Sequence, residues 1–215
     1  MKARALAMAS LLLLTASLTA CESDGDGDGD GDGPDGDEVG QMVSDPSGSA
    51  SFRIVSTSDA EESADLIAML PSARTALAEG FQQAASDGYV ISGKFELSDE
   101  GAGPISLSVY TARAGKETIP EENELVELAG DPTGSSWAPG AEVFEDFEHI
   151  ARASQQLTLM QTTSATLASV ARAAGELGTV YRVEPAVVQG RAVFRLLVAG
   201  DGGSASEVHV ALAPL

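Results

Sequence analysis

The chain has 215 residues, and its 33 Asp and Glu residues against 12 Lys and Arg give a formal net charge of −21 at pH 7. So large a negative charge disfavours nucleic acid and anionic lipid headgroups as partners, because both repel it. The single cysteine excludes an intramolecular disulfide, so an exported form of this chain depends on its hydrophobic core for stability.

The first 20 residues have the features of an export signal. Lys2 and Arg4 provide a positive start, and residues 5–18 form an uncharged stretch rich in Leu and Ala. That stretch matches the apolar region of a signal peptide and is shorter than the about 20 apolar residues of a membrane-spanning helix. We therefore expect residues 1–20 to be a signal peptide.

The signal ends in Leu18-Thr19-Ala20-Cys21, which resembles the lipobox of bacterial lipoproteins. In that family the cysteine thiol receives a diacylglyceryl group, cleavage follows on its N-terminal side, and the new amine is acylated. The resemblance implies that Cys21 is the lipidation site and that the lipid bilayer is a partner, since two or three acyl chains anchor a protein stably. Glu22, in place of the Asp that retains some lipoproteins at the inner membrane, favours the outer membrane. The alternative is an ordinary secretory signal with an unmodified Cys21.

We expect residues 21–50 to be the lipidated cysteine followed by a disordered linker. Residues 23–38 consist of Ser, Asp, Gly, Pro and Glu, so carboxylate repulsion and the chain entropy of glycine oppose folding. Residues 39–50 contain the turn-forming run Pro46, Ser47, Gly48 and Ser49 and are expected to continue the linker.

The Asp-Gly repeat also matches the opening D-x-D-x-D-G of a calcium loop from Asp24 onward. The rest of that loop is missing, because Gly31 stands where an apolar residue belongs and Asp35 where a bidentate Glu belongs. The repeat is therefore predicted to be an acidic spacer with no specific metal site.

The remaining chain is expected to form two α+β units, residues 51–133 and 134–215. A shift of 90 residues aligns identical residues without a gap, which indicates an internal duplication. The aligned pairs are Leu77-Ala78 with Leu167-Ala168, Ala84 with Ala174, Gly88 with Gly178, and Val90 with Val180.

In the first unit we expect a short helix at residues 64–70 and a second helix with Ala73, Leu77, Phe81 and Ala84 on one face. Gly88 is expected to end the second helix in the left-handed conformation. Alternating apolar residues then predict strands at residues 89–97, 105–109 and 125–129.

In the second unit, Val143, Phe144, Phe147, Ile150 and Ala151 predict an amphipathic helix. Another helix with an apolar stripe is expected to run from residue 167 to 177 and to end at Gly178. Strands are predicted at residues 179–188, 191–199 and 207–213, with tight turns at 189–190 and 200–203.

Helices that each pack on a curled antiparallel meander define an α+β fold. The order of elements resembles PepSY-type repeats of bacterial envelope proteins over residues 63–129 and 160–213. The resemblance is carried by Tyr181-Arg182-Val183, Gly190 and the run 193–198. It implies a non-catalytic domain that binds an envelope protein or peptide or modulates a peptidase, and it supplies no active-site residues.

Candidate catalytic residues are few. His149 and His209 lie too far apart in sequence for an H-E-x-x-H zinc site, and no nucleophile elbow, P-loop or dinucleotide-binding motif is present. We interpret both histidines as solvated or structural, and we assign no catalytic residue, cofactor or metal.

Two further features keep an enzyme hypothesis open. The acidic cluster Glu142, Glu145, Asp146 and Glu148 could supply paired carboxylates, although acids at a helix start are ordinarily placed there by the helix dipole. Trp137 is interpreted as a packing or interface residue in preference to a sugar platform. The two hypotheses are a non-enzymatic binding domain and a hydrolase that uses acidic residues. A pocket in which two carboxylates converge would favour the hydrolase, and an exposed sheet face would favour the binding domain.

Overall fold

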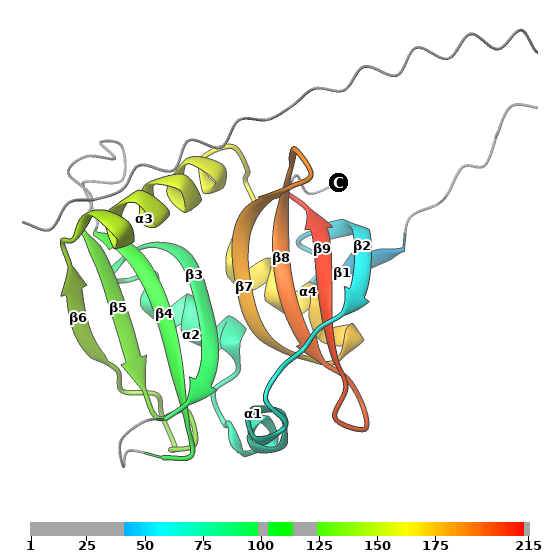
Figure 1. The fold of residues 1–215 in the computed structure, drawn as a ribbon, viewed down its shortest axis with the longest axis horizontal. Coiled ribbons are helices and arrows are strands. Elements are labelled where there is room, and N and C mark those ends of the chain that lie inside the picture. The colour runs from blue at the N-terminus through cyan, green and yellow to red at the C-terminus, as the bar shows by residue number, and fades with distance from the viewer. Residues whose placement is uncertain (1–40, 99–102, 114–123, 213–215) are drawn as a thin grey trace, which may run out of the picture. The chain divides into compact units, whose positions relative to one another are not determined.

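Nine antiparallel strands form one continuous sheet, in the order β1-β2-β9-β8-β7-β3-β4-β5-β6 (Figure 1). The computed structural model describes residues 41–98, 103–113 and 124–212. The strands are β1 Met42–Ser44, β2 Ser51–Asp59, β3 Gly88–Leu97, β4 Ile105–Arg113, β5 Leu125–Gly130, β6 Gly140–Phe144, β7 Thr179–Val188, β8 Arg191–Ala199 and β9 Ala205–Ala211.

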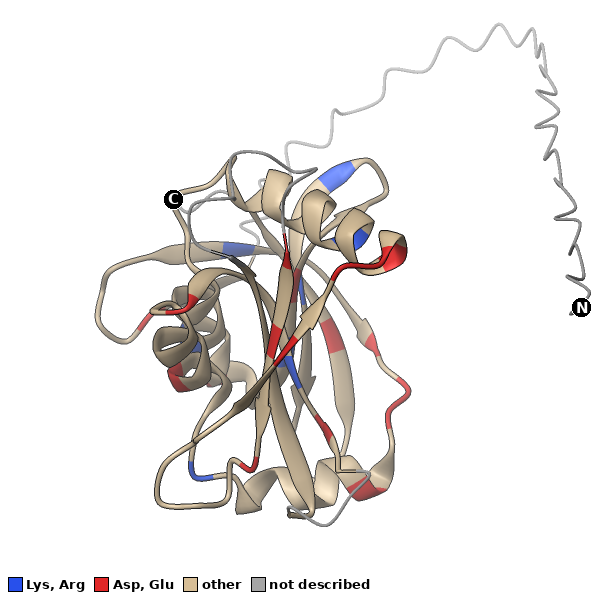
Figure 2. Ribbon diagram, turned by 90° about the vertical axis from the view of Figure 1, so that its left-hand side faces the viewer, with Lys and Arg blue, Asp and Glu red and all other residues tan. Residues whose placement is uncertain are grey.

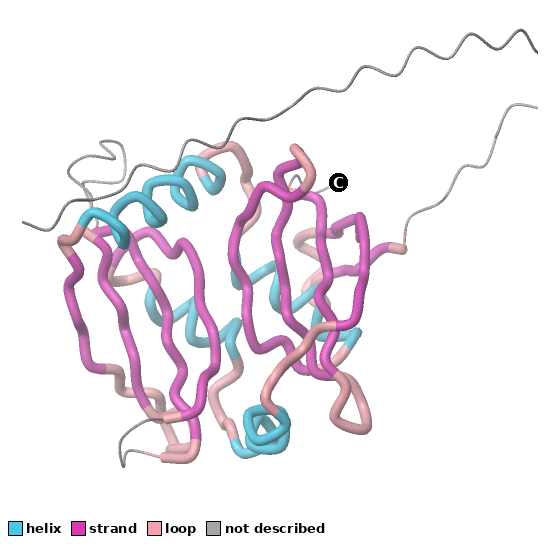
Figure 3. The backbone as a smooth tube through the Cα atoms, viewed as in Figure 1, coloured by secondary structure: helices cyan, strands magenta, loops and turns pink. Residues whose placement is uncertain are grey.

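Helices cover both faces of this sheet, so the fold is α+β as expected, with a large share of strand. Helices α2 and α4 pack against each other on one face, which we call the back face, and α3 crosses the opposite front face (Figure 3). The helices are α1 Ala64–Met69, α2 Leu77–Ala84, α3 Phe147–Met160 and α4 Leu167–Ala174, with 3-10 turns η1 Leu70–Ser72 and η3 Gly175–Leu177.

The apolar stripes of α2 and α4 meet the back face of the sheet in one large core. Leu77 and Leu167, which the 90-residue shift aligns, are each 2% exposed in this core. A smaller cluster on the front face holds α3 against β3, β4 and β5 through Ala153 and Leu157. Side chains on both faces are therefore buried near the centre of the sheet, and Figure 2 shows charged residues on its strands as well as on its loops.

Elements of the two halves of the chain follow the same 90-residue offset. The bounds of α2 and α4 differ by that offset, and β3 and β7 each carry a bulge at matching places, between Val90 and Ser92 and between Val180 and Arg182. The two strands also pair with each other at Gly93 and Val183. The matching helix bounds and bulges are structural similarities, and they are independent of the few identical residues that suggested the 90-residue shift.

Strand pairing crosses the expected boundary at residue 133. Strand β6 follows that boundary and pairs with β5, whereas β2 precedes it and pairs with β9. Residues 51–133 and 134–215 therefore do not form separate sheets, and the chain from Val39 to Leu215 is one compact unit.

The expectation that residues 41–50 continue the linker is wrong. Strand β1 pairs with β2, and its Val43 is fully buried. The adjoining Asp45 is 2% exposed, accepts hydrogen bonds from Ser47 and Ser49, and forms an ion pair with Arg172 at 3.0 Å. The backbone hydrogen bond from Ser47, with the other donors and against the effect of burial, lowers the pKa of Asp45 to about 2. A single buried apolar residue in a polar run was too weak a pattern to indicate this strand.

The start of one helix also differs from expectation. Val143 and Phe144 belong to β6, because they pair with Val126 and Leu125 of β5. The helix α3 begins at Phe147, after Asp146 accepts a hydrogen bond from the amide of His149. The apolar residues of β6 and α3 follow one another at helical spacing, so the sequence pattern predicted a single helix.

Gly178 follows the last residue of η3 and ends the helical run as expected, whereas Gly88, which was expected to end the second helix in the left-handed conformation, is the first residue of β3. Gly88 has no positive φ, and Gly178 has φ 144° and ψ −162°, which is outside the left-handed helical region. A Cβ on either residue would clash with a backbone carbonyl of the neighbouring strand, that of Ala112 for Gly88 and that of Ala199 for Gly178. The glycines thus permit close approach of β4 and β8.

The matched leucines make the packing testable. Leu77→Ala and Leu167→Ala should each lower the free energy of unfolding by about 2–5 kcal/mol, because both remove a buried side chain from a packed core. Leu97→Ala, at a site that is 40% exposed, is the control and should have little effect. The duplication also predicts that Phe95 matches Val187 or a near neighbour of Val187 in the second unit; Val187 itself is 63% exposed and is not a core residue. Chemical denaturation that shows a large loss for one leucine and almost none for the other would contradict equivalent roles.

Candidate functional site

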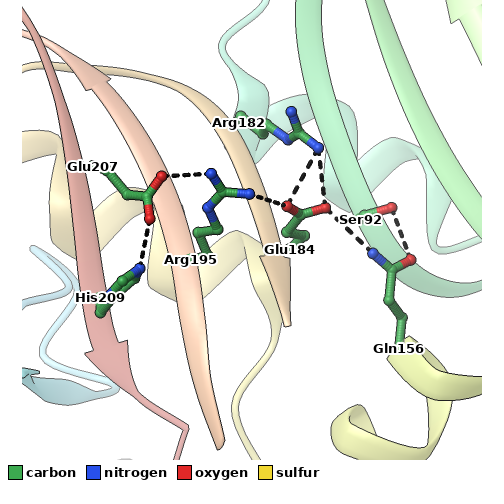
Figure 4. A network of polar contacts seen from close by, with 7 residues as sticks. All are labelled: Ser92, Gln156, Arg182, Glu184, Arg195, Glu207 and His209. Atoms are coloured by element: carbon green, nitrogen blue, oxygen red, sulfur yellow. Dashed lines mark hydrogen bonds and ion pairs between the residues drawn. The ribbon is translucent and has the colours of Figure 1, made fainter. Parts of the chain in front are cut away.

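Polar side chains form a connected row across the front face of the sheet (Figure 4). On β8 and β9 the alternate residues Phe194, Leu196, Val208 and Val210 point into the back core. Because side chains alternate along a strand, the residues between them point to the front. We call the connected set the polar row: Ser92, Gln156, Arg182, Glu184, Arg195, Glu207 and His209.

Glu184 is the centre of the polar row. It accepts hydrogen bonds from Gln156 at 3.4 Å, from Arg182 at 3.3 Å and from Arg195 at 3.4 Å. Gln156 is buried on α3, and its side-chain oxygen accepts a hydrogen bond from Ser92 at 3.3 Å. The row therefore connects α3 to β3 and β7 through one carboxylate.

The polar row continues along the front face from β8 to β9 and β2. Arg195 Nη2 lies 2.5 Å from Glu207 Oε2, and Glu207 Oε1 lies 2.8 Å from His209 Nε2. His209 Nδ1 in turn lies 2.8 Å from Ser56 Oγ on β2. The hydrogen bond from Arg195 lowers the pKa of Glu207, against the effect of burial, and the same bond raises the pKa of Arg195. These charges compensate each other on a partly exposed surface.

A cavity of about 130 Å³ lies between α3 and the front face. Its wall includes Lys94 and Arg182, which are direct cross-strand neighbours on β3 and β7. Tyr110 also lines it and donates a hydrogen bond to Glu127 at 2.9 Å. Burial, together with the negative charge of Glu127, raises the pKa of Tyr110. The cavity is thus charged and contains both signs.

The cavity carboxylates do not converge. Glu127 lies on β5 and Glu184 on β7, and β4 and β3 lie between these strands. Three strand spacings amount to about 14 Å along the sheet. Paired carboxylates that cleave a glycosidic bond lie about 5–9.5 Å apart. The arrangement therefore suits recognition of a charged ligand better than acid and base catalysis by this pair.

The acidic cluster considered from the sequence is spread over the surface. Glu142, Glu145 and Glu148 are exposed, and Asp146 caps α3. His149 Nδ1 lies 2.6 Å from Asp146 Oδ2, and its ring stacks on that of Phe144 with a centroid distance of 4.4 Å. The acidic cluster thus lies at the start of a helix. None of its four carboxylates lines the cavity, although the neighbouring Phe144 and His149 do.

The other sequence candidates have structural surroundings. Trp137 is 2% exposed and lies in the back core, which confirms the packing interpretation. His209 is held by Glu207 on one side and Ser56 on the other. Cys21 and the acidic spacer with Asp24 lie outside the described residues.

Residues 41–98, 103–113 and 124–212 contain no group of three or more His, Cys, Asp or Glu side chains that could hold a metal ion. Within the same ranges, no helix has the length and apolar character needed to cross a bilayer.

His209 is the one member of the polar row that was a candidate from the sequence. A partial signal exists, because Arg182 and Glu184, and likewise Glu207 and His209, stand two positions apart on strands. The pattern could not show that β7, β8 and β9 bring them together, nor that Gln156 reaches them from α3. Comparison of the chain with protein-family models, curated proteins and solved structures finds no match.

Replacing Arg195 tests the electrostatics of the polar row. Arg195→Gln should raise the pKa of Glu207 toward its ordinary value of 4.5, because the main group that lowers it is removed. A carboxyl with a lowered pKa stabilises the fold above its ordinary pKa, and this contribution is lost as the pH falls. The variant should therefore be less stable than the wild type by about 1 kcal/mol at neutral pH. The difference should shrink as the pH falls below 4.5.

The comparison uses urea unfolding at several pH values, with carbon NMR of the Glu207 carboxyl. Arg191→Gln, on the same strand and outside the polar row, is the control. A stability difference that does not change with pH would contradict the assigned pair.

Proposed function

We propose that this protein is a lipid-anchored binding protein of the bacterial cell envelope. Export, cleavage before Cys21 and acylation of that residue would place the folded domain at a membrane surface. The observation that carries this proposal is the run Leu18-Thr19-Ala20-Cys21 after an uncharged apolar stretch, with the only cysteine of the chain at the position that the lipobox requires. Glu22 supports the outer membrane as its location.

The linker would hold the domain away from the lipid. Since β1 begins at Met42, about 20 residues separate Cys21 from the first strand. Flexible-chain scaling gives such a segment a root-mean-square reach of about 25 Å, which repulsion between its carboxylates extends. The domain can then turn its front face toward a ligand or an envelope partner.

We infer that the domain consists of two duplicated α+β units that share one sheet, as in PepSY-like repeats. The matching bounds of α2 and α4, the matching bulges and the pairing of Gly93 with Val183 support this interpretation. Strand β2 of the first unit pairs with β9 of the second, and β6 of the second unit pairs with β5 of the first, so the two units are interleaved. Such a sheet carries the polar row on its front face, which α3 crosses.

A binding or peptidase-modulating role agrees better with this front face than a hydrolytic one does. The polar row is internally paired, and the two cavity carboxylates lie on strands separated by two others. The hydrolase hypothesis required carboxylates that converge, so it has no geometric support among the described residues.

Cys21→Ser tests the anchor, because a serine hydroxyl cannot replace the thiol as the diacylglyceryl acceptor. In a Gram-negative host, the wild type should incorporate labelled palmitate and stay in the membrane pellet after a high-salt wash. The variant should incorporate none and move to the soluble fraction. Ser23→Ala, two residues along, is the matched control and should behave as the wild type. A Cys21→Ser protein that remains in the pellet would rule out the lipid anchor.

A further inference from the structure

We propose that the cavity between α3 and the front face binds a small free α-amino acid in its zwitterionic form, an assignment that rests on the binding role proposed above. The ligand carboxylate would meet Arg152 beside Lys94 and Arg182, and its ammonium would meet Glu127. All four side chains line the cavity.

The cationic side of the cavity is unusual for so acidic a chain. Arg152 projects from α3 and has no ion pair or hydrogen bond with another residue in the described ranges. Lys94 and Arg182 stand directly opposite each other on β3 and β7, an arrangement that is unfavourable for like charges. Glu96 and Glu184 each neutralise one of them, which leaves Arg152 as the free cation.

The anionic side has a matching free charge. Glu127 accepts a hydrogen bond from Tyr110, but no cation within the described residues pairs with it. Its direct neighbour on β6 is Glu142, which has the same charge and cannot compensate it. Glu127 therefore presents a carboxylate to the cavity without a counterion from the described part of the protein.

The two free charges define the chemistry of the ligand. Arg152 and Glu127 line the same cavity, and they form no ion pair with each other. A molecule with a carboxylate and an ammonium can satisfy both at once. A phosphate dianion would be repelled by Glu127 and Glu184, and a simple amine by the three cations.

The size and walls of the cavity limit the ligand further. Its volume of about 130 Å³ is close to that of an engineered cavity of about 150 Å³ that holds benzene, a molecule of six non-hydrogen atoms. Alanine has six non-hydrogen atoms. Leu125, Phe144 and Ala153 provide an apolar wall for a small side chain, and the amide of Gln156 is fixed by Ser92 and Glu184. The volume of the cavity therefore matches glycine, alanine or serine.

Calorimetric titration of the full chain with L-alanine, glycine and L-serine tests the assignment. Propionate, which lacks the ammonium, and ethylamine, which lacks the carboxylate, are the matched probes. At least one amino acid should bind with saturation, and both probes should bind about ten- to a hundredfold more weakly, because each leaves either Arg152 or Glu127 without an opposite charge. If propionate binds as tightly as alanine, the cavity does not recognise the ammonium group and the zwitterion assignment is wrong. If none of the three amino acids shows saturable binding, the cavity is not an amino-acid site.

Two variants locate the binding. Arg152→Gln and Glu127→Gln should each weaken amino-acid binding about ten- to a hundredfold. Arg191→Gln and Glu176→Gln, at exposed positions outside the cavity, should leave it unchanged. Thermal unfolding of every variant shows whether it is folded. Equal binding by the wild type and both folded cavity variants would place the ligand elsewhere. These titrations do not depend on Cys21. A lack of amino-acid binding would therefore contradict the cavity assignment alone, and the membrane fractionation would still test the lipid anchor.

Discussion

The central strands β3 and β7 join through only two residue pairs, Gly93 with Val183 and Lys94 with Arg182. The bulges in both strands lie just before this junction. So short a ladder contributes few backbone hydrogen bonds, and the contact between α2 and α4 behind it supplies much of the packing between the two halves of the sheet. Gly93 makes this packing possible, because a Cβ there would lie 2.5 Å from the ring of Phe81 on α2.

The same junction shapes the front face. Phe95 of β3 and Val183 of β7 lie in the back core, whereas Glu184 of β7 faces forward, where Gln156 of α3 donates a hydrogen bond to it. The polar row then compensates the charges from β7 to β9, while the cavity, whose wall includes residues of both β3 and β7, keeps Arg152 and Glu127 unpaired within the described residues. The front face thus carries two neighbouring groups of charges: those of the polar row pair with each other, and Arg152 and Glu127 in the cavity do not.

Local patterns in the sequence identify much of this fold. The stripes around Leu77 and Leu167 predict α2 and α4, and alternating residues predict most long strands. The sequence could not reveal β1, because only Val43 is buried there, or separate β6 from α3, because their apolar spacing is continuous. The exchange of β2 and β6 between halves, and hence the polar row, depends on pairing between distant segments, which local periodicity does not encode.

Native-state hydrogen exchange of Phe81→Ala tests most directly whether the two halves share one cooperative core. Phe81 is 2% exposed on α2, on the β3 side of the junction. If the packing of α2 on α4 unites the sheet, the free energies of exchange at Val109 on β4 and at Leu196 on β8 should fall together, by about 3–5 kcal/mol. A fall confined to β4, with β8 unchanged from the wild type, would show that the halves unfold independently and would contradict this account.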